Sequence, residues 1–113
     1  MNCLFCKIVN KDIHATIIYE DDYVMAFHDL HPQAPTHVLI IPKNHISTLN
    51  DLTDSDTVTL GHVVQAASKI AKQLNHAENG YRVVMNCNKD GGQSVFHIHM
   101  HLLAGRQLDW PPG

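Results

Sequence analysis

The order of apolar and polar positions along the chain predicts several strands before and after one long helix. Residues 15–21, ATIIYED, and residues 23–29, YVMAFHD, flank a polar turn, a pattern typical of a β-hairpin. Two prolines within residues 31–35, HPQAP, indicate a loop. Residues 36–42, THVLIIP, form a nearly continuous apolar run that suits a central strand ending at its proline.

Residues 53–75 are expected to form the long helix. Apolar residues recur there at steps of three and four, which places them on one face: Leu60, Val63, Val64, Ala67, Ile70, Ala71 and Leu74. Thr53 and Asp56 have the spacing of a capping box at the helix start. The segment CLFCKIVNK at residues 3–11 is expected to form a short first helix.

Two further strands are expected after the long helix. Residues 81–87, YRVVMNC, follow an Asn-Gly turn, and residues 88–92, NKDGG, make a second turn before SVFHIHMHLLAG at residues 94–105. Strands outnumber helices and most connections are short. We therefore expect a single α+β domain over residues 1–113, with a mostly antiparallel five-stranded sheet, one long helix and a short N-terminal helix.

Composition narrows the class of protein. The 113 residues are 44% hydrophobic and 17% charged, as in an ordinary globular domain. A formal charge of −3 predicts no duplex nucleic acid partner, and no apolar run approaches a membrane span, so no membrane association is expected. Residues 1–10 lack the features of a signal peptide, so a cytoplasmic location is expected. Three cysteines make an odd count, which argues against a disulfide framework.

Ten histidines are the outlier of the composition, and three of them form a row at 97, 99 and 101. Strand side chains alternate between faces, so the row should share one face with neighbouring rings roughly 6.5 to 7 Å apart. The residues between them should face the core: Phe96, Ile98, Met100 and Leu102. Such a row could be a solvated polar face, a metal site or a catalytic group.

The loop before the row favours catalysis. Gly91 and Gly92 allow backbone conformations closed to other residues, and they let the main chain approach a ligand. Exposed N–H groups in such a turn bind anions, and Ser94 adds a hydroxyl donor. A phosphate site beside the histidine row is therefore expected.

The segment HIHMHLL resembles the His-x-His-x-His-x-x signature of the histidine triad (HIT) superfamily. The resemblance extends to the Hint branch through YEDDYVMAFHDLHPQAPTHVLIIPKNHI, DGGQSVFHIHMHLLAGRQ and the terminal WPPG. It implies a HIT-like fold, a homodimer whose two sheets join, and binding of purine nucleotides. It also implies hydrolysis of nucleoside 5′-phosphoramidates, such as adenosine 5′-phosphoramidate, to a nucleoside monophosphate and an amine.

The resemblance also implies roles for the histidines. His99 would be the nucleophile, forming a nucleotidyl-histidine, with its ring oriented by the main-chain carbonyl of His97. His101 would hold the phosphate oxygens, and His37 would support the row. Ser94 would pass a proton to the leaving amine.

Further residues match the nucleotide site of the family. Asp29 would accept hydrogen bonds from both ribose hydroxyls. The purine would be enclosed by Ile18, Phe27, His28 and Leu30. The phosphate and ribose would be surrounded by Asn86, Gly92 and Gln93, together with Ser94, His99 and His101. Trp110 would shape the leaving-group pocket of the partner subunit, although simple dimer packing is an equal alternative.

The Cys-x-x-Cys pair at residues 3–6 indicates a candidate metal site in addition to the catalytic site. By resemblance to zinc-binding HIT proteins, the ligands would be Cys3, Cys6, His45 and His97. Four such ligands close a tetrahedral site, so this zinc would be structural, and no catalytic metal is expected. The alternatives are a redox pair and two small buried residues.

Two other functions compete with phosphoramidate hydrolysis. One is hydrolysis of dinucleoside polyphosphates, as in the Fhit type, and the other is a non-catalytic nucleotide-binding regulator. The short tail GRQLDWPPG favours the Hint branch over the first. An intact histidine row with Ser94 argues against the second.

Overall fold

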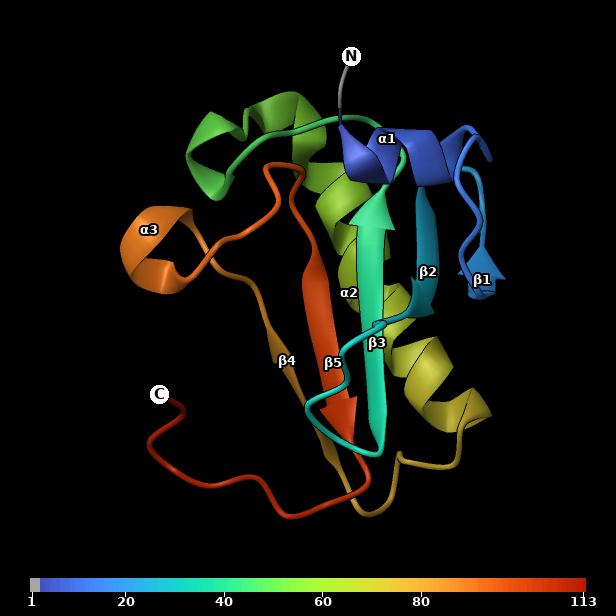
Figure 1. The fold of residues 1–113 in the computed structure, drawn as a ribbon, viewed down its shortest axis with the longest axis vertical. Helices are drawn as coiled ribbons and strands as arrows, with labels where there is room; N and C mark the ends of the chain where they lie inside the picture. Colours follow the sequence, from blue (N-terminus) through green and yellow to red (C-terminus); the bar gives the residue numbers. More distant parts are fainter. Residues whose placement is uncertain (1–2) are drawn as a thin grey trace.

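A five-stranded antiparallel sheet with helices on both faces organises the chain (Figure 1). The computed structural model describes residues 3–113, so the first two residues of the expected domain lie outside the described part. In chain order the elements are α1 Leu4–Val9, β1 Ile17–Glu20, β2 Val24–His28, β3 Thr36–Pro42, α2 Thr57–Gln73, β4 Tyr81–Val84, α3 Asn88–Gly91 and β5 Met100–Ala104. The strand order is β1-β2-β3-β5-β4. The predicted α+β class is confirmed.

Strand β3 lies at the centre of the sheet, and both of its faces are covered. Val38 and Ile40 belong to the core under α2, while Leu39 and Ile41 belong to a second core under α1. Burying each such side chain contributes about 1.5 to 3 kcal/mol. Coverage on both faces explains why the sequence of β3 is continuously apolar rather than alternating.

Helix α2 spans 17 residues, and a 3-10 turn over Asp54–Asp56 precedes it. The Asp56 carboxylate accepts a hydrogen bond from the Thr53 main-chain N–H at 2.9 Å, as the predicted capping box requires. The predicted apolar stripe is wrong at one position: Val64 is 55% exposed, and Ala66 is buried instead.

Among the described residues, no helix is both long enough and apolar enough to cross a membrane.

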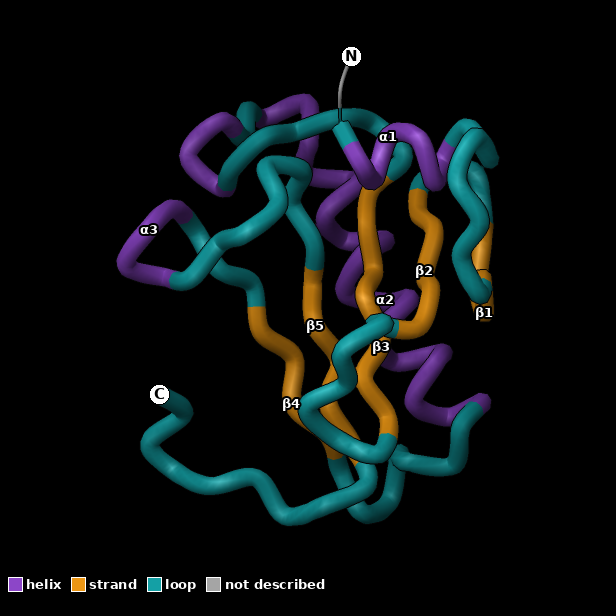
Figure 2. The backbone as a smooth tube through the Cα atoms, in the orientation of Figure 1, coloured by secondary structure: helices purple, strands orange, loops and turns teal. Residues whose placement is uncertain are grey.

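Strand β5 is shorter than the sequence predicted, and the histidine-containing segment that precedes it is a loop (Figure 2). Val84, the last residue of β4, pairs with His101, so the sheet offers no partner on that side before residue 100. The Ile98 N–H instead donates to the Ile46 carbonyl at 2.7 Å. Phe96 is 51% exposed, so its predicted core position is wrong, whereas Ile98 is buried.

Segment 88–92, expected to be a turn, contains the short helix α3 instead. The helix ends at Gly92, whose φ of 85° lies in the left-handed region that glycine adopts without strain. Asn88 also has a positive φ, of 59°. Its main-chain N–H donates to the Gln93 side-chain oxygen at 2.9 Å, which closes the loop on itself.

Candidate active site

The register of β3 against β5 brings His37 and His101 together. His37 lies opposite Leu103 and His101 lies opposite Leu39, so the two histidines are diagonal neighbours on one face. Their ring centroids are 5.2 Å apart, and His37 Nε2 lies 2.9 Å from His101 Nδ1. Sixty-four residues of sequence separate the two histidines. Only the sheet therefore places His37 where it could support His101, as predicted.

Main-chain contacts decide which nitrogen of each ring carries the proton. The Gln33 N–H donates to His37 Nδ1 at 3.0 Å, so neutral His37 must hold its proton on Nε2. That Nε2–H then donates to His101 Nδ1. His101 in turn holds its own proton on Nε2, where it can donate to an external oxygen.

Both rings are held in the neutral state. Burial lowers the pKa of His37, although the Asp29 carboxylate opposes the shift. Burial, together with the nearby His99 and His37, lowers the pKa of His101 to about 4. A neutral His101 near pH 7 offers one N–H donor and carries no charge.

His99 has the opposite arrangement of its nitrogens. Its Nδ1 lies 2.8 Å from the His97 carbonyl, the contact that the family resemblance implies, so Nδ1 carries the proton. No described protein group bonds Nε2, and no fully buried side-chain nitrogen of the described residues lacks a partner. The Nε2 lone pair of this 7% exposed side chain therefore reaches the surface and is available as a nucleophile.

The three rings of the row do not stand at one spacing along a strand. The His99 and His101 centroids are only 5.0 Å apart and their planes are inclined at 61°, and His99 lies just before β5 rather than within it. His97 lies outside β5 and turns toward the N-terminal segment rather than toward His101. The row therefore serves two separate clusters of side chains.

Phe5 is a site residue that the sequence reasoning missed. Its ring meets His99 edge-on at 5.2 Å and also contacts His97 at 5.9 Å and Phe27 at 5.5 Å. Such edge-to-face contacts fix ring orientation and contribute about 0.5 to 1.5 kcal/mol each. The available signal was its place between the two cysteines, one of which caps α1 and the other of which lies on it.

Four side chains converge near the N-terminus in a group that we call the cysteine–histidine cluster: Cys3, Cys6, His45 and His97. Their ligand atoms all lie within 4.8 Å of one another. His97 Nδ1 is 3.4 Å from Cys3 Sγ and 3.6 Å from Cys6 Sγ, and His45 Nδ1 is 3.3 Å from Cys6 Sγ. A tetrahedral zinc with normal bond lengths requires about 3.5 Å between such sulfur and nitrogen atoms. The residues therefore fit a zinc ion.

The surroundings of the cluster also suit a metal. His97 Nε2 donates to the Pro42 carbonyl at 2.8 Å, and His45 Nε2 lies 3.1 Å from the Ser47 hydroxyl. Such outer contacts point the Nδ1 lone pairs inward, as in metal-binding histidines. Burial lowers the pKa of His97, which keeps its ring neutral. Burial and the neighbouring Cys3 raise the pKa of the Cys6 thiol, so a bound metal would have to displace the proton of that thiol.

The loop residues predicted to meet the phosphate lie in different environments. Gln93 is buried, and its NH₂ group donates to the Ser47 carbonyl at 2.8 Å and the Val95 carbonyl at 3.0 Å. Its amide thus holds the loop in shape. Ser94 is exposed and borders a pocket of 490 Å³ beside Cys3 and His45. Asn86 is half-buried under Gly91.

Asp29 lies beside the histidine pair at the end of β2. Its Oδ2 is 3.5 Å from His37 Nε2, and its Oδ1 accepts the His31 N–H at 2.7 Å. The Asp29 N–H donates to the His37 carbonyl at 2.9 Å, which ties the two residues together. The carboxylate remains partly accessible, with 19% of its side chain exposed.

The structure brings together only some of the predicted purine-binding residues. Phe27 is buried in the core under α1, whereas His28 and Leu30 are exposed, Leu30 to 89%. Ile18 packs against the other core, under α2. The register places Ile17 beside Phe27, because the hairpin is irregular between Ile17 and Tyr19.

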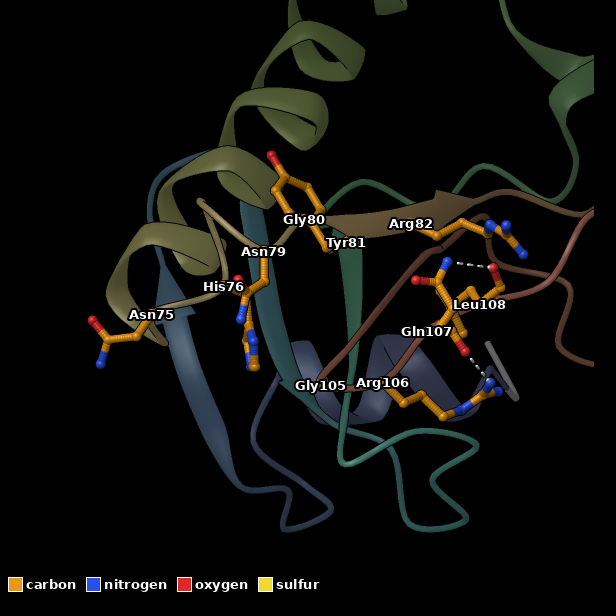
Figure 3. A pocket seen from close by; sticks show the side chains of 10 residues that line it. All are labelled: Asn75, His76, Asn79, Gly80, Tyr81, Arg82, Gly105, Arg106, Gln107 and Leu108. Carbon is orange, nitrogen blue, oxygen red and sulfur yellow. Dashed lines mark hydrogen bonds between the residues drawn. The ribbon is translucent and has the colours of Figure 1, made fainter.

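Two features lie apart from the histidines. Trp110 is 81% exposed, with the Arg82 guanidinium 5.9 Å from its ring centroid. A polar hollow of 760 Å³ lies between residues 75–82 and residues 105–108 (Figure 3). None of the predicted catalytic residues lines this hollow.

Comparison with known proteins agrees with the histidine geometry. The HIT domain matches residues 10–108. The chain belongs to the HIT domain family. It is 52% identical to the purine nucleoside phosphoramidase of Escherichia coli (strain K12) over 105 residues, covering 93% of this chain and 88% of that protein.

Other relatives match nearly the whole chain. A 14 kDa zinc-binding protein of Zea mays is 49% identical over 112 residues, covering 97% of this chain and 87% of the maize protein. The crystal structure of a HIT family hydrolase from Legionella pneumophila superposes with a TM-score of 0.97 at 54% identity, covering 99% of this chain and all of that one. The predicted family and HIT-like fold are thus confirmed.

Proposed function

We propose that this protein hydrolyses purine nucleoside 5′-phosphoramidates to a nucleoside monophosphate and an amine. The observation that carries the proposal is the state of His99, whose Nδ1 is held on the His97 carbonyl while Nε2 stays open. The 52% identity to a purine nucleoside phosphoramidase supports the same reaction.

The reaction proceeds in two displacements. His99 Nε2 attacks the α-phosphorus, the phosphorus–nitrogen bond breaks, and the amine leaves with a proton passed through Ser94. Water then attacks the nucleotidyl-histidine and releases a proton to solvent, which balances the proton that solvent supplied to the amine through Ser94. The monophosphate leaves and neutral His99 is restored. The hydrogen bond to the His97 carbonyl stabilises the positive charge that the ring carries in between.

His101 binds the phosphate while charge develops on it. Its Nε2–H donates to a nonbridging oxygen, and this contact strengthens as the oxygen gains charge. His37 keeps that donor in place because its own Nε2–H occupies His101 Nδ1 at 2.9 Å. The Gly92 N–H donates to the Lys89 carbonyl and the Gln93 N–H to the Asn88 carbonyl, each at 3.0 Å, so these two groups shape the loop rather than bind the phosphate.

The nucleoside lies toward β2 in this proposal. The partly exposed Asp29 carboxylate accepts the ribose hydroxyls, and its distance of 3.5 Å from His37 links the ribose to the histidine pair. The apolar contacts to the base come from Phe27, Leu30 and Ile17 rather than from Ile18, which packs under α2.

The cysteine–histidine cluster holds a structural zinc ion in this proposal. Sulfur–nitrogen distances of 3.3 to 3.6 Å support it, as does the zinc-binding maize relative. When bound, such an ion supplies cross-linking rather than a reactive water, because four protein ligands leave no open position. Cys3, Cys6 and His45 would thereby fix α1, and with it Phe5, against the histidine row.

A homodimer formed through the β4 edge completes the proposal. β4 is an edge strand, and Tyr81 and Val83 on it are 39% and 40% exposed. Trp110 is 81% exposed near this edge, as a residue that reaches a partner subunit would be. Light scattering coupled to gel filtration should give twice the chain mass, and a monomer at micromolar concentration would contradict this part.

Substrate competition tests the function directly. Adenosine 5′-phosphoramidate and diadenosine polyphosphates should be compared by kcat/KM, and the phosphoramidate should be preferred. Preference for the polyphosphate would assign the Fhit-type reaction instead. Nucleotide binding without turnover of either substrate would indicate a regulator.

A further inference from the structure

Arg106 forms an unusual set of contacts just after β5. Its guanidinium makes three hydrogen bonds, all to main-chain carbonyls: Nε and Nη2 to Gln33 at 3.2 and 3.0 Å, and Nη1 to Gln107 at 3.1 Å. No carboxylate among the described residues pairs with it. Figure 3 shows the bond to Gln107 at the rim of the polar hollow.

The connection between β2 and β3 is the segment that Arg106 holds. Gly105 packs against the same segment, so closely that an added Cβ would lie 2.9 Å from the Pro35 ring. A φ of 95° at Gly105 turns the chain toward this contact. Gly105 and Arg106, the two residues that follow β5, thus fix a loop far earlier in the sequence, and 73 residues separate Arg106 from Gln33.

That loop supplies the donor on which the histidine pair depends. The Gln33 N–H bonds His37 Nδ1 at 3.0 Å, and His37 Nε2 bonds His101 Nδ1 at 2.9 Å. Without the Gln33 donor, His37 could carry its proton on Nδ1, and its Nε2 would then accept a hydrogen bond from the Nδ1–H of His101. His101 would then turn a lone pair, rather than an N–H, toward the phosphate.

We infer that Arg106 is a positioning residue, which fixes Gln33 so that the proton of His101 stays on the outward nitrogen, Nε2. Arg106 acts here through a main-chain N–H and two histidine rings, and it does not contact the substrate. A guanidinium suits this task because its rigid fork can place two N–H groups on one carbonyl. The kinetic part of the inference rests on the proposed phosphoramidase activity, whereas the tautomer does not.

The test reads the tautomer first and the kinetics second. Nitrogen-15 NMR of the ligand-free full-length protein distinguishes a protonated from an unprotonated ring nitrogen. In the wild type, His101 Nε2 should be protonated and Nδ1 unprotonated. In Arg106→Gln a measurable fraction of His101 should carry its proton on Nδ1, and in Arg106→Lys that fraction should be smaller.

Arg82→Gln is the matched control for the tautomer. Arg82 also donates to a main-chain carbonyl, that of Asp109 at 2.9 Å, but it forms no hydrogen bond with the described residues of the β2–β3 connection. Its removal should leave the His101 tautomer as in the wild type. An unchanged tautomer in Arg106→Gln, or an equal change in Arg82→Gln, would overturn the inference.

Gln33 provides a second pair of variants that does not depend on Arg106. Gln33→Pro removes the main-chain donor and should shift the His101 tautomer further than Arg106→Gln does. Gln33→Ala keeps that donor and should preserve the tautomer, even though its side-chain bond to the His31 carbonyl is lost. A shift in Gln33→Ala as large as in Gln33→Pro would overturn the role of the N–H.

The kinetic readout separates positioning from general loosening. Arg106→Gln should lower kcat about fivefold with little change in KM, because only the contact to the developing charge is weakened. Arg106→Lys should recover part of kcat. A fall in kcat/KM caused only by a higher KM would contradict a positioning role, even with the tautomer shifted.

Discussion

Two histidine groups lie side by side in this protein and differ in the nitrogen that each ring leaves available. In the cysteine–histidine cluster, His97 turns Nε2 to the Pro42 carbonyl and leaves Nδ1 facing two thiols. Two residues later, His99 turns Nδ1 to a carbonyl and leaves Nε2 facing outward. The first arrangement has the geometry of a metal site, and the second leaves a ring nitrogen open to a substrate.

The difference shows that the fixed partner of each ring, more than the residue type, sets its chemistry. Imidazole offers one donor and one acceptor when neutral, so occupying one nitrogen defines the other. Main-chain groups occupy a nitrogen of His97, His99 and His37, and His37 then does the same for His101. Such partners survive most substitutions, because they belong to the backbone.

The largest expected effect separates the two groups by activity. His99→Ala should lower kcat by about 10⁴-fold or more, since the open Nε2 that forms the covalent intermediate is removed. His45→Ala should lower kcat less than tenfold while removing a zinc ligand. Stopped assays of phosphoramidate turnover with both variants check this. A His99→Ala enzyme with near-normal turnover would break the division of roles.

The next effect separates the groups by stability. Cys3→Ser should lose bound zinc, and the free energy of unfolding should fall by about 4 kcal/mol, the value for free zinc at roughly a thousand times its Kd. Metal analysis and denaturant unfolding measure the two quantities. His99→Ala serves as the control and should retain its zinc. Equal zinc content in Cys3→Ser and wild type would show that the cysteine–histidine cluster is not the zinc site.

Acid should destabilise the fold through His101, which lies beside His99. The pKa of His101 is about 4 in the folded protein and ordinary once unfolded, so the unfolded state binds more protons between these values. Stability should therefore fall as the pH drops from about 6.5 to 4, by on the order of 3 kcal/mol. Urea unfolding of metal-free protein measures it. His101→Gln should flatten the slope, and a slope identical to wild type would place its origin in other histidines.

The smallest expected effect concerns the contact between the groups. Phe5→Leu should lower the free energy of unfolding by about 1 kcal/mol, because three edge-on ring contacts are lost. It should also lower kcat two- to threefold, roughly the effect of a less restrained His99 ring. Phe96→Leu, at a 51% exposed position, is the control and should change stability by less than about 0.5 kcal/mol. Equal losses in both variants would exclude a special role for Phe5.

Much of the fold was readable from the sequence because its signals are local. The continuous apolar run of β3, its end at Pro42 and the hairpin of β1 and β2 were predicted where they occur. The extent of β5 was not, since a strand ends where its neighbours stop pairing, and β4 stops at Val84. The exposure of Val64 likewise depends on which side of α2 meets the sheet.

Within the candidate site, the sequence alone identified the histidines, the two cysteines and Asp29 by their spacing and family resemblance. It also implied the bond between His99 and the His97 carbonyl, a contact two residues apart. It did not reveal Phe5, Gln33 or Arg106, whose contacts with the histidines or with one another join distant parts of the chain. For His97, His37 and His101, tertiary structure alone decided which ring nitrogen is occupied, because a tautomer is set by whichever donor or carbonyl the fold places against the ring.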